Sequence, residues 1–370
     1  MLVLVKVAFL GCLQPKLSSV LSVLWCRTSW LSLIGVSAAV SAASLEESSV
    51  GSAAATSARV VKVDDSRATD TYVPRQEVVD RMVERGLSSL WNTPTPDLGW
   101  RALISPSDVV GIRVHSSAGK TSGTRPQVVS AVARSLIASG HPRNQIIVWD
   151  RQLSSLRAAG YFSLRESLGI QVLGARDLGY DSEAFYESSL IGTMIWGDHE
   201  FGQTGEGIGR KSYVSKLLSE KIDKIINLSP LLNHNLAGVN GNLFGLAMAS
   251  VDNTIRFQSG PDRLAVAIPE INAVPEVGDH VVLSITDALI AQYQGQSQAR
   301  LQDSVVLNEL WFSADPVALD TLALNKLDEL RAERGINFVF KDRSIYQNAS
   351  LLQLGMSDPE QIQVHRVSLP

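Results

Sequence analysis

The chain has 370 residues, of which 45% are hydrophobic and 19% charged, a composition typical of a globular protein with ample material for a core. The formal net charge is −4, from 33 basic and 37 acidic residues. Without Lys6, Lys16 and Arg27 of the N-terminal segment, 30 basic residues remain and the net charge is −7. An acidic balance argues against a nucleic-acid partner and against an anionic membrane surface as a partner.

Residues 1–43 have the layout of a secretory signal. Sparse positive charges precede the apolar stretch WLSLIGVSAAVSAA, which ends in small residues. We expect cleavage near Ala42 or Ala43 and export to the periplasm or the extracellular space. An uncleaved segment would instead remain as a membrane anchor, which is the one route to a membrane that the sequence indicates.

Both cysteines, Cys12 and Cys26, lie in this N-terminal segment. The rest of the chain therefore has no disulfide and no thiolate metal ligand, which argues against an iron–sulfur cluster. Histidine and carboxylate ligands without sulfur would suit zinc, manganese, iron or nickel. The sequence announces no cofactor and leaves the identity of any metal open.

A Ser/Ala-rich linker is predicted over residues 44–57, and a single domain over residues 58–370. Strands and amphipathic helices alternate in its first half, which predicts an α/β fold: a mostly parallel sheet flanked by helices on both faces. The expected strands are residues 59–63, 109–115, 146–149 and 170–173. The expected helices are residues 75–90, 126–137 and a short one before Gly160, with a loop at residues 92–97.

The second half begins with an insertion, a hairpin or loop at about residues 176–211, which interrupts this alternation. The apolar run at residues 225–228 reads as a buried strand that stops at Pro230. Residues 252–262 are expected to form a polar loop. Further strands are predicted at residues 281–285 and 305–312, and helices at residues 213–219, 288–294, 316–334 and 349–354.

The loop after the strand at residues 225–228 is the strongest candidate site. Its sequence, NHNLAGVNGN, carries His234, Asn240 and Asn242 among glycines, between two apolar runs. Open α/β sheets build ligand sites at the carboxyl ends of their strands. The alternative is a solvated connection whose Asn and Gly residues only supply turn geometry.

Other polar residues follow predicted strands and could converge at the same edge of the sheet. His115, Asp150 and Asp287 stand at strand exits, and His199 lies between two acidic residues in the insertion. No two histidines have the H-x-x-x-H spacing that places two metal ligands on one helix face, so the pattern favours a surface or hydrogen-bonded residue for each histidine taken singly. We assign catalytic roles to His234, Asp287 and Asp315, and ligand-binding roles to His115, Lys120, Asp150, Asn240 and Asn242.

Three common sequence motifs are absent from the chain. The loop around Lys120 lacks the earlier glycine of a phosphate-binding loop, where Val114 stands, although its strand–loop–helix setting suits an anion. No Gly-x-Ser-x-Gly elbow and no dinucleotide fingerprint after the first strand is present. Asp315 precedes Pro316 at the start of a helix, so it also reads as an N-cap.

Several stretches together resemble the domain of unknown function 362 family, over roughly residues 57–368. They are DVVGIRVH, IIVWDR, KIINLSPLLNHNLAGVNGNLFG, VLSITDALIAQYQG and SADPVALDTLALNKLDELR. The resemblance implies an α/β sheet protein of bacteria or archaea without a settled activity. Many members carry cysteine-rich ferredoxin-like segments, which this chain lacks. The family also usually has a lysine where Asn233 stands and a Lys-Asn pair where Gly241 and Asn242 stand.

Three functions remain open. The first is an exported enzyme with a cleft lined by His, Asp and Asn, in which His234 is a general acid or base or a ligand. The second is a non-catalytic module that binds a small anion or polyol, and the third is a redox-associated protein with a bound cofactor. An orienting carboxylate or carbonyl on His234 would favour catalysis.

Overall fold

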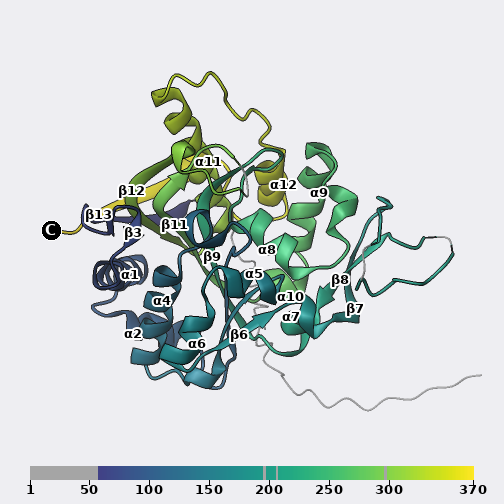
Figure 1. Ribbon diagram of the computed structural model, residues 1–370, viewed down its shortest axis with the longest axis horizontal. Helices are drawn as coiled ribbons and strands as arrows, with labels where there is room; N and C mark the ends of the chain where they lie inside the picture. The colour runs from purple at the N-terminus through teal and green to yellow at the C-terminus, as the bar shows by residue number, and fades with distance from the viewer. Residues whose placement is uncertain (1–56, 195–196, 206, 296–297) are drawn as a thin grey trace, which may run out of the picture. The chain divides into compact units, whose positions relative to one another are not determined.

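The structure, a computed structural model, describes residues 57–370 apart from 195–196, 206 and 296–297 (Figure 1). The predicted signal segment and nearly all of the linker lie outside the described residues. Within the described part of the chain, no helix is long and apolar enough to cross a membrane. Export and the boundaries of the domain therefore stay predictions.

Nine of the described strands form one sheet, which confirms the α/β class. The order is β13-β1-β12-β11-β9-β4-β5-β6, with β10 paired to β9 beside this path. All neighbours run parallel except that β12 is antiparallel to β1 and β11, and β10 to β9. The strands are β1 (Ala58–Asp64), β4 (Val110–Arg113), β5 (Ile146–Asp150), β6 (Gln171–Gly174), β9 (Lys224–His234), β10 (Gly238–Val239), β11 (Val281–Gln292), β12 (Ser304–Ser313) and β13 (Ile362–Ser368).

Helices cover both faces of the sheet because successive strand residues point to opposite sides (Figure 1). Ile226 of β9 joins one hydrophobic core and its neighbour Ile225 joins the other. On the Ile226 face lie α1 (Gln76–Trp91), α2 (Pro96–Leu103), α4 (Pro126–Ala138), α5 (Leu153–Ala158) and α6 (Phe162–Leu168). On the Ile225 face lie α7 (Lys216–Glu220), α8 (Asn242–Ser250), α9 (Pro261–Asn272), α10 (Pro275–Gly278), α11 (Pro316–Glu333) and α12 (Ser344–Leu351).

The inserted segment forms a hairpin, as predicted. Its strands β7 (Tyr180–Glu187) and β8 (Lys211–Ser215) pair antiparallel. The helix expected at residues 213–219 begins only at Lys216, because Tyr213 pairs with Phe185 in the hairpin. The Ser215 hydroxyl accepts the amide hydrogen of Leu217 and caps α7. The remaining short elements are β2 (Thr69–Asp70), β3 (Val73–Pro74), α3 (Gly119–Ser122) and single 3-10 turns.

Two strands are longer than predicted. β9 does not stop at Pro230 but continues to His234, and β11 continues to Gln292 through the stretch expected to be a helix. Every residue from Leu283 to Gln292 is buried, so that the apolar run ALIA shows no helical stripe of exposed positions. The β11–β9 pairing is interrupted after the Asp287–Pro230 pair. Pro230 has no amide hydrogen to donate there.

The elements that were missed in the sequence include α2, α9 and β13. Helices α2 and α9 each begin with a proline, Pro96 and Pro261, at the first helical position, which was the available signal. The terminal strand β13 lies beside β1. Its residues are mostly exposed, so it carries little of the hydrophobic pattern on which the predictions relied.

The chain reverses its direction of travel across the sheet at β4. From β4 the strands β5 and β6 follow to one side, and the chain then returns to place β9 and β11 on the other side. The carboxyl ends of β4 and β9 therefore flank a topological switch point. Ligands of open α/β sheets bind at such a point.

Candidate functional site

A cavity of about 170 Å³ lies at the carboxyl ends of β4 and β5. Its polar wall includes Arg113, His115, Asp150, Arg151 and Asn240, and its other wall is the helix α8 with Phe244, Gly245, Met248 and Ala249. The structure thus brings together His115, Asp150 and Asn240 of the predicted residues. It adds two arginines that the sequence analysis did not assign.

Arg113 is the last residue of β4 and is only 1% exposed. Its Nη1 donates to Ser229 Oγ at 3.1 Å, while its Nε has no hydrogen-bond partner among the residues that the structure describes. No described carboxylate lies within ion-pair distance of it, although Asp150 and Asp320 are close enough to act on it electrostatically. Burial lowers the pKa of Arg113 from its ordinary value, but an arginine stays charged at neutral pH.

Gly245 makes room for this guanidinium. A Cβ at Gly245 would lie 2.2 Å from Arg113 Nη1. The side chain of Arg113 therefore rests against the backbone of α8, where any larger residue would displace it.

Arg151 supplies a second positive charge to the cavity. Its Nη1 donates to the carbonyl oxygen of Met248 at 3.0 Å and to Thr254 Oγ1 at 2.8 Å. The carbonyl oxygen of Met248 fixes the guanidinium at the carboxyl-terminal part of α8, and Thr254 ties it to the 3-10 turn that follows. A cation is favourable there because the last carbonyls of a helix carry partial negative charge.

His115 and Asn240 are joined in the wall of the cavity. Asn240 Nδ2 donates to His115 Nε2 at 3.0 Å, and Ser117 Oγ lies 3.1 Å from the same nitrogen. Because an amide nitrogen only donates, Nε2 is the acceptor and Nδ1 carries the proton. Burial lowers the pKa of His115 to about 4, so the ring is neutral at pH 7. Asn240 Oδ1 is buried and without a hydrogen-bond partner in the described part of the chain.

Asp150 holds the two strand exits together. One carboxylate oxygen accepts the amide hydrogen of Ser116 at 2.8 Å and its hydroxyl hydrogen at 2.5 Å; the other accepts the amide hydrogen of Arg151 at 2.7 Å. This carboxylate is the one negative charge among the residues that line the cavity.

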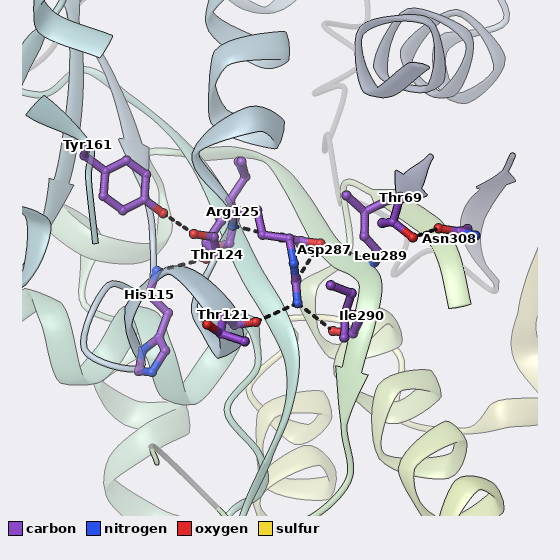
Figure 2. A network of polar contacts seen from close by, with 11 residues as sticks. Thr69, His115, Thr121, Thr124, Arg125, Tyr161, Asp287, Leu289, Ile290 and Asn308 are labelled. Atoms are coloured by element: carbon purple, nitrogen blue, oxygen red, sulfur yellow. Dashed lines mark hydrogen bonds and ion pairs between the residues drawn. The ribbon is translucent and has the colours of Figure 1, made fainter. Parts of the chain in front are cut away.

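Asp287 was expected at a strand exit, but it lies in the middle of β11. There it pairs with Arg125 (Figure 2). Asp287 Oδ1 lies 3.0 Å from Arg125 Nη1, and Oδ2 accepts the Arg125 amide hydrogen at 2.9 Å. Arg125 also donates from Nη2 to the carbonyl oxygens of Thr121 and Ile290. Arg125 stands at the N-cap position of α4, so the carboxylate of Asp287 lies at the start of this helix, where the sequence setting suits an anion.

Lys120 and Asp315 also lie away from the cavity. Lys120 is exposed, and a Cβ at Gly160 would be 2.8 Å from its Cε. Asp315 caps α11 by accepting the amide hydrogens of Ala318 and Met356, each at 2.8 Å. It was expected at the carboxyl edge of the sheet, but β12 runs antiparallel to β11 and delivers it to the opposite edge.

His234 ends β9 and lines a different space, a groove of about 570 Å³. Its Nδ1 accepts the amide hydrogens of Ala237 at 3.0 Å and Leu236 at 3.3 Å, and its ring contacts Phe244 with centroids 4.1 Å apart. Burial lowers the pKa of His234 to about 4. The nitrogen that would accept a proton is thus occupied by backbone amides, which does not suit a general base.

Asn242 is the first residue of α8 and has a structural role there. Its amide nitrogen and its Nδ2 donate to Asp320 Oδ1 at 2.7 and 3.0 Å, and Leu243 N donates to Asp320 Oδ2 at 2.9 Å. Asp320 of α11 therefore caps the first turn of α8. Burial raises the pKa of Asp320 to about 6.

None of the described residues form a cluster of three or more His, Asp or Glu side chains that could hold a metal ion. Arg113 was missed although the sequence carries a signal for it. A charged residue inside an apolar run, VVGIRVH, must either find an opposite charge or serve a ligand.

The family described as Domain of unknown function (DUF362) matches residues 110–325, more than half of the chain. The chain belongs to the DUF362 family. The match begins with β4 and ends within α11, so it includes the cavity and α8. The family resemblance expected from the sequence is confirmed.

No curated protein matches this DUF362 chain. A crystal structure of a Thermotoga maritima protein, a target of the Northeast Structural Genomics Consortium, is similar with 12% sequence identity and a TM-score of 0.39. The similarity covers 72% of this chain and 60% of the other chain.

Proposed function

We propose that this DUF362 protein binds a small anion in the cavity between α8 and the carboxyl ends of β4 and β5. The observation that carries the proposal is Arg113, a buried arginine with no carboxylate at ion-pair distance among the described residues. A buried charge without a partner costs several kcal/mol. A bound anion would offset that cost.

The neighbouring groups support the same ligand. Arg151 lines the cavity with a second guanidinium, and guanidinium groups bind carboxylates and phosphates through paired hydrogen bonds. The cavity lies at the carboxyl end of β4, one of the two strands that flank the switch point, and ligands of open α/β sheets bind near such points.

The surroundings of His234 favour ligand binding over acid–base catalysis as the function of the protein. The Nδ1 of His234 accepts backbone amide hydrogens, and the ring lines the groove rather than the cavity. The second hypothesis from the sequence, a small-ligand binding module, therefore has the better support.

The test compares the purified protein with Arg113→Met, using acetate and inorganic phosphate as probes. We expect an anion to raise the melting temperature of the wild type, and the variant to lose at least roughly tenfold in affinity, as for a charged hydrogen-bond partner. The variant should also melt higher without ligand, because methionine removes an unpaired buried charge.

Arg134→Met is the matched control, since Arg134 is an exposed arginine paired with Asp80. Its anion response should equal that of the wild type. Unchanged anion binding in Arg113→Met, or destabilisation of that variant without any anion effect, would show that Arg113 serves the fold alone.

We also propose export, on the signal-like pattern of residues 1–43. The N-terminal residue of the protein purified from the extracellular or periplasmic fraction checks this. A start near residue 43 or 44 is expected, and a protein that retains Met1 in the cytosolic fraction contradicts it.

A further inference from the structure

The groove that His234 lines continues into a second hollow, and we call the two together the extended groove. Asn235, Phe338 and Phe340 line both parts, so they lie where the parts meet. From there one part extends to Arg300 and the other to Pro261. None of the described residues that line the extended groove lines the cavity of the proposed anion site. The extended groove is therefore a separate space, and its continuity suits an elongated ligand.

Phe338 presents an aromatic ring where the two parts of the extended groove meet. It is 50% exposed, and the Cζ atom of Arg331 lies 5.3 Å from the centroid of its ring. This cation–π contact holds the ring in position. Val339, which is 55% exposed, and Phe340 extend the apolar surface. The negative face of an aromatic ring attracts groups with partial positive charge, such as the C–H groups on the face of a sugar ring.

Amide side chains supply hydrogen-bonding groups along the extended groove. They belong to Asn233, Asn235, Gln294, Gln298 and Asn337. Asn235 Oδ1 accepts a hydrogen from Asn233 Nδ2 at 3.2 Å, whereas the exposed Nδ2 of Asn235 has no hydrogen-bond partner among the described residues. A side-chain amide offers donors and an acceptor next to each other, and a hydroxyl group also donates and accepts. The polar part of the lining therefore matches a ligand that is rich in hydroxyl groups.

The arginines of the extended groove are paired within the chain, in contrast to Arg113. Arg331 is only 3% exposed; its Nη1 donates to Asp328 Oδ1 at 2.7 Å and its Nε to a backbone carbonyl oxygen at 3.0 Å. Its Nη2 has no hydrogen-bond partner among the described residues and is not enclosed. Arg300 Nη1 lies 3.7 Å from Asp303 Oδ2. These guanidinium groups offer N–H donors without an unbalanced charge, which favours neutral hydroxyl groups over an anion.

From these observations we infer that the extended groove binds a neutral carbohydrate chain. A sugar ring stacks on Phe338, and its hydroxyl groups bind the amide of Asn235 and the free Nη2 of Arg331. The inference goes beyond the proposed anion site and does not depend on it. It gives the protein a second ligand of a different chemical class.

Calorimetric titration with maltohexaose, cellohexaose and chitohexaose tests the inference. We expect the wild type to bind at least one of these neutral sugars. Phe338→Ala should lose at least roughly tenfold in affinity, because it removes the aromatic face at the centre of the extended groove. Asn235→Ala should lose roughly three- to tenfold, as for one hydrogen bond. Both side chains are exposed, so neither change should unfold the protein.

Phe201→Ala is the matched control, since Phe201 is 48% exposed and lines neither part of the extended groove; it should bind the sugar as the wild type does. Arg113→Met should do so too, because Arg113 lines the cavity. If no neutral sugar binds the wild type, or if Phe338→Ala binds it equally well, the inference is overturned, whatever the anion titrations show. Loss of sugar binding in Arg113→Met would place the sugar in the cavity and overturn it as well. So would tighter binding of the acidic chain polygalacturonate than of every neutral sugar.

Discussion

Arg113 and Asp287 are both charged residues inside buried strands, but their surroundings differ. Asp287 is 0% exposed and has Arg125 against both carboxylate oxygens, whereas Arg113 has one neutral hydroxyl partner. The charge of Asp287 is therefore balanced by an ion pair within the chain, whereas the charge of Arg113 has no such ion pair among the described residues. The sequence alone does not separate the two cases, because the partner of Asp287 comes from a segment more than 150 residues away.

Removal of Asp287 should destabilise the protein strongly. Asp287→Ala leaves Arg125 as an uncompensated buried charge, and we expect a loss of about 3–5 kcal/mol in the free energy of unfolding. Urea denaturation measures it. The double variant Asp287→Ala with Arg125→Met should recover part of the loss. If the single and double variants are equally stable, the pair does not have the structural role described here.

The two neutral histidines should make stability depend on pH. His115 and His234 have pKa values of about 4 in the folded protein, against about 6.5 in an unfolded chain. Below pH 6.5 the unfolded chain binds protons that the folded chain does not, so the free energy of unfolding falls as the pH is lowered towards 4.

Comparison with His234→Gln isolates one of these contributions. Between pH 7 and pH 5 the wild type should lose about 2 kcal/mol more than the variant. The raised pKa of Asp320 acts in the opposite direction, but it is present in both proteins and cancels. Parallel stability curves for the two proteins would contradict the low pKa of His234.

At the scale of the element, α8 organises the cavity. Its first turn is capped by Asp320, Gly245 admits the guanidinium of Arg113, and the carbonyl of Met248 holds Arg151. One helix thus fixes both arginines. Its apolar sequence predicted burial, but nothing in it predicted that α11 supplies its cap.

Gly245→Ala should impair anion binding without unfolding the protein. The added methyl group would lie 2.2 Å from Arg113 Nη1 and push the guanidinium aside, while alanine favours the helix by about 1 kcal/mol over glycine. Titration with acetate should show at least a roughly tenfold loss of affinity, with the circular dichroism spectrum unchanged. Wild-type affinity in this variant would mean that Arg113 does not bind the anion.

At the scale of the molecule, local patterns predicted the elements and non-local pairing decided the positions. β4, β5, α4 and α11 were found because their apolar residues repeat with a clear period and their helices start at proline. The direction of β12 has no local signal. Asp315 was therefore expected at the wrong edge of the sheet, although its role as a helix cap was recognised.

β13 illustrates the same limit and gives a further prediction. It pairs with β1 over the whole register from Ala58–Ile362 to Asp64–Ser368 and covers that edge. A chain ending after Gln361 would expose the hydrogen-bonding groups of β1, so we expect lower stability and self-association, measured by size-exclusion chromatography. A chain ending after Ser368 is the control and should stay as the wild type; equal behaviour of both would refute the protective role of β13.

The ring of Phe244 is shared by two spaces, because it lines the cavity and contacts the ring of His234, which lines the groove. A ligand that moves Phe244 in the cavity would therefore also change the surroundings of His234 in the groove. If a ligand that shifts Phe244 changes the affinity of His234 for a proton, the proton must change the affinity for the ligand by the same factor. A titration of the His234 imidazole followed by nuclear magnetic resonance, with and without an anion, would measure this effect.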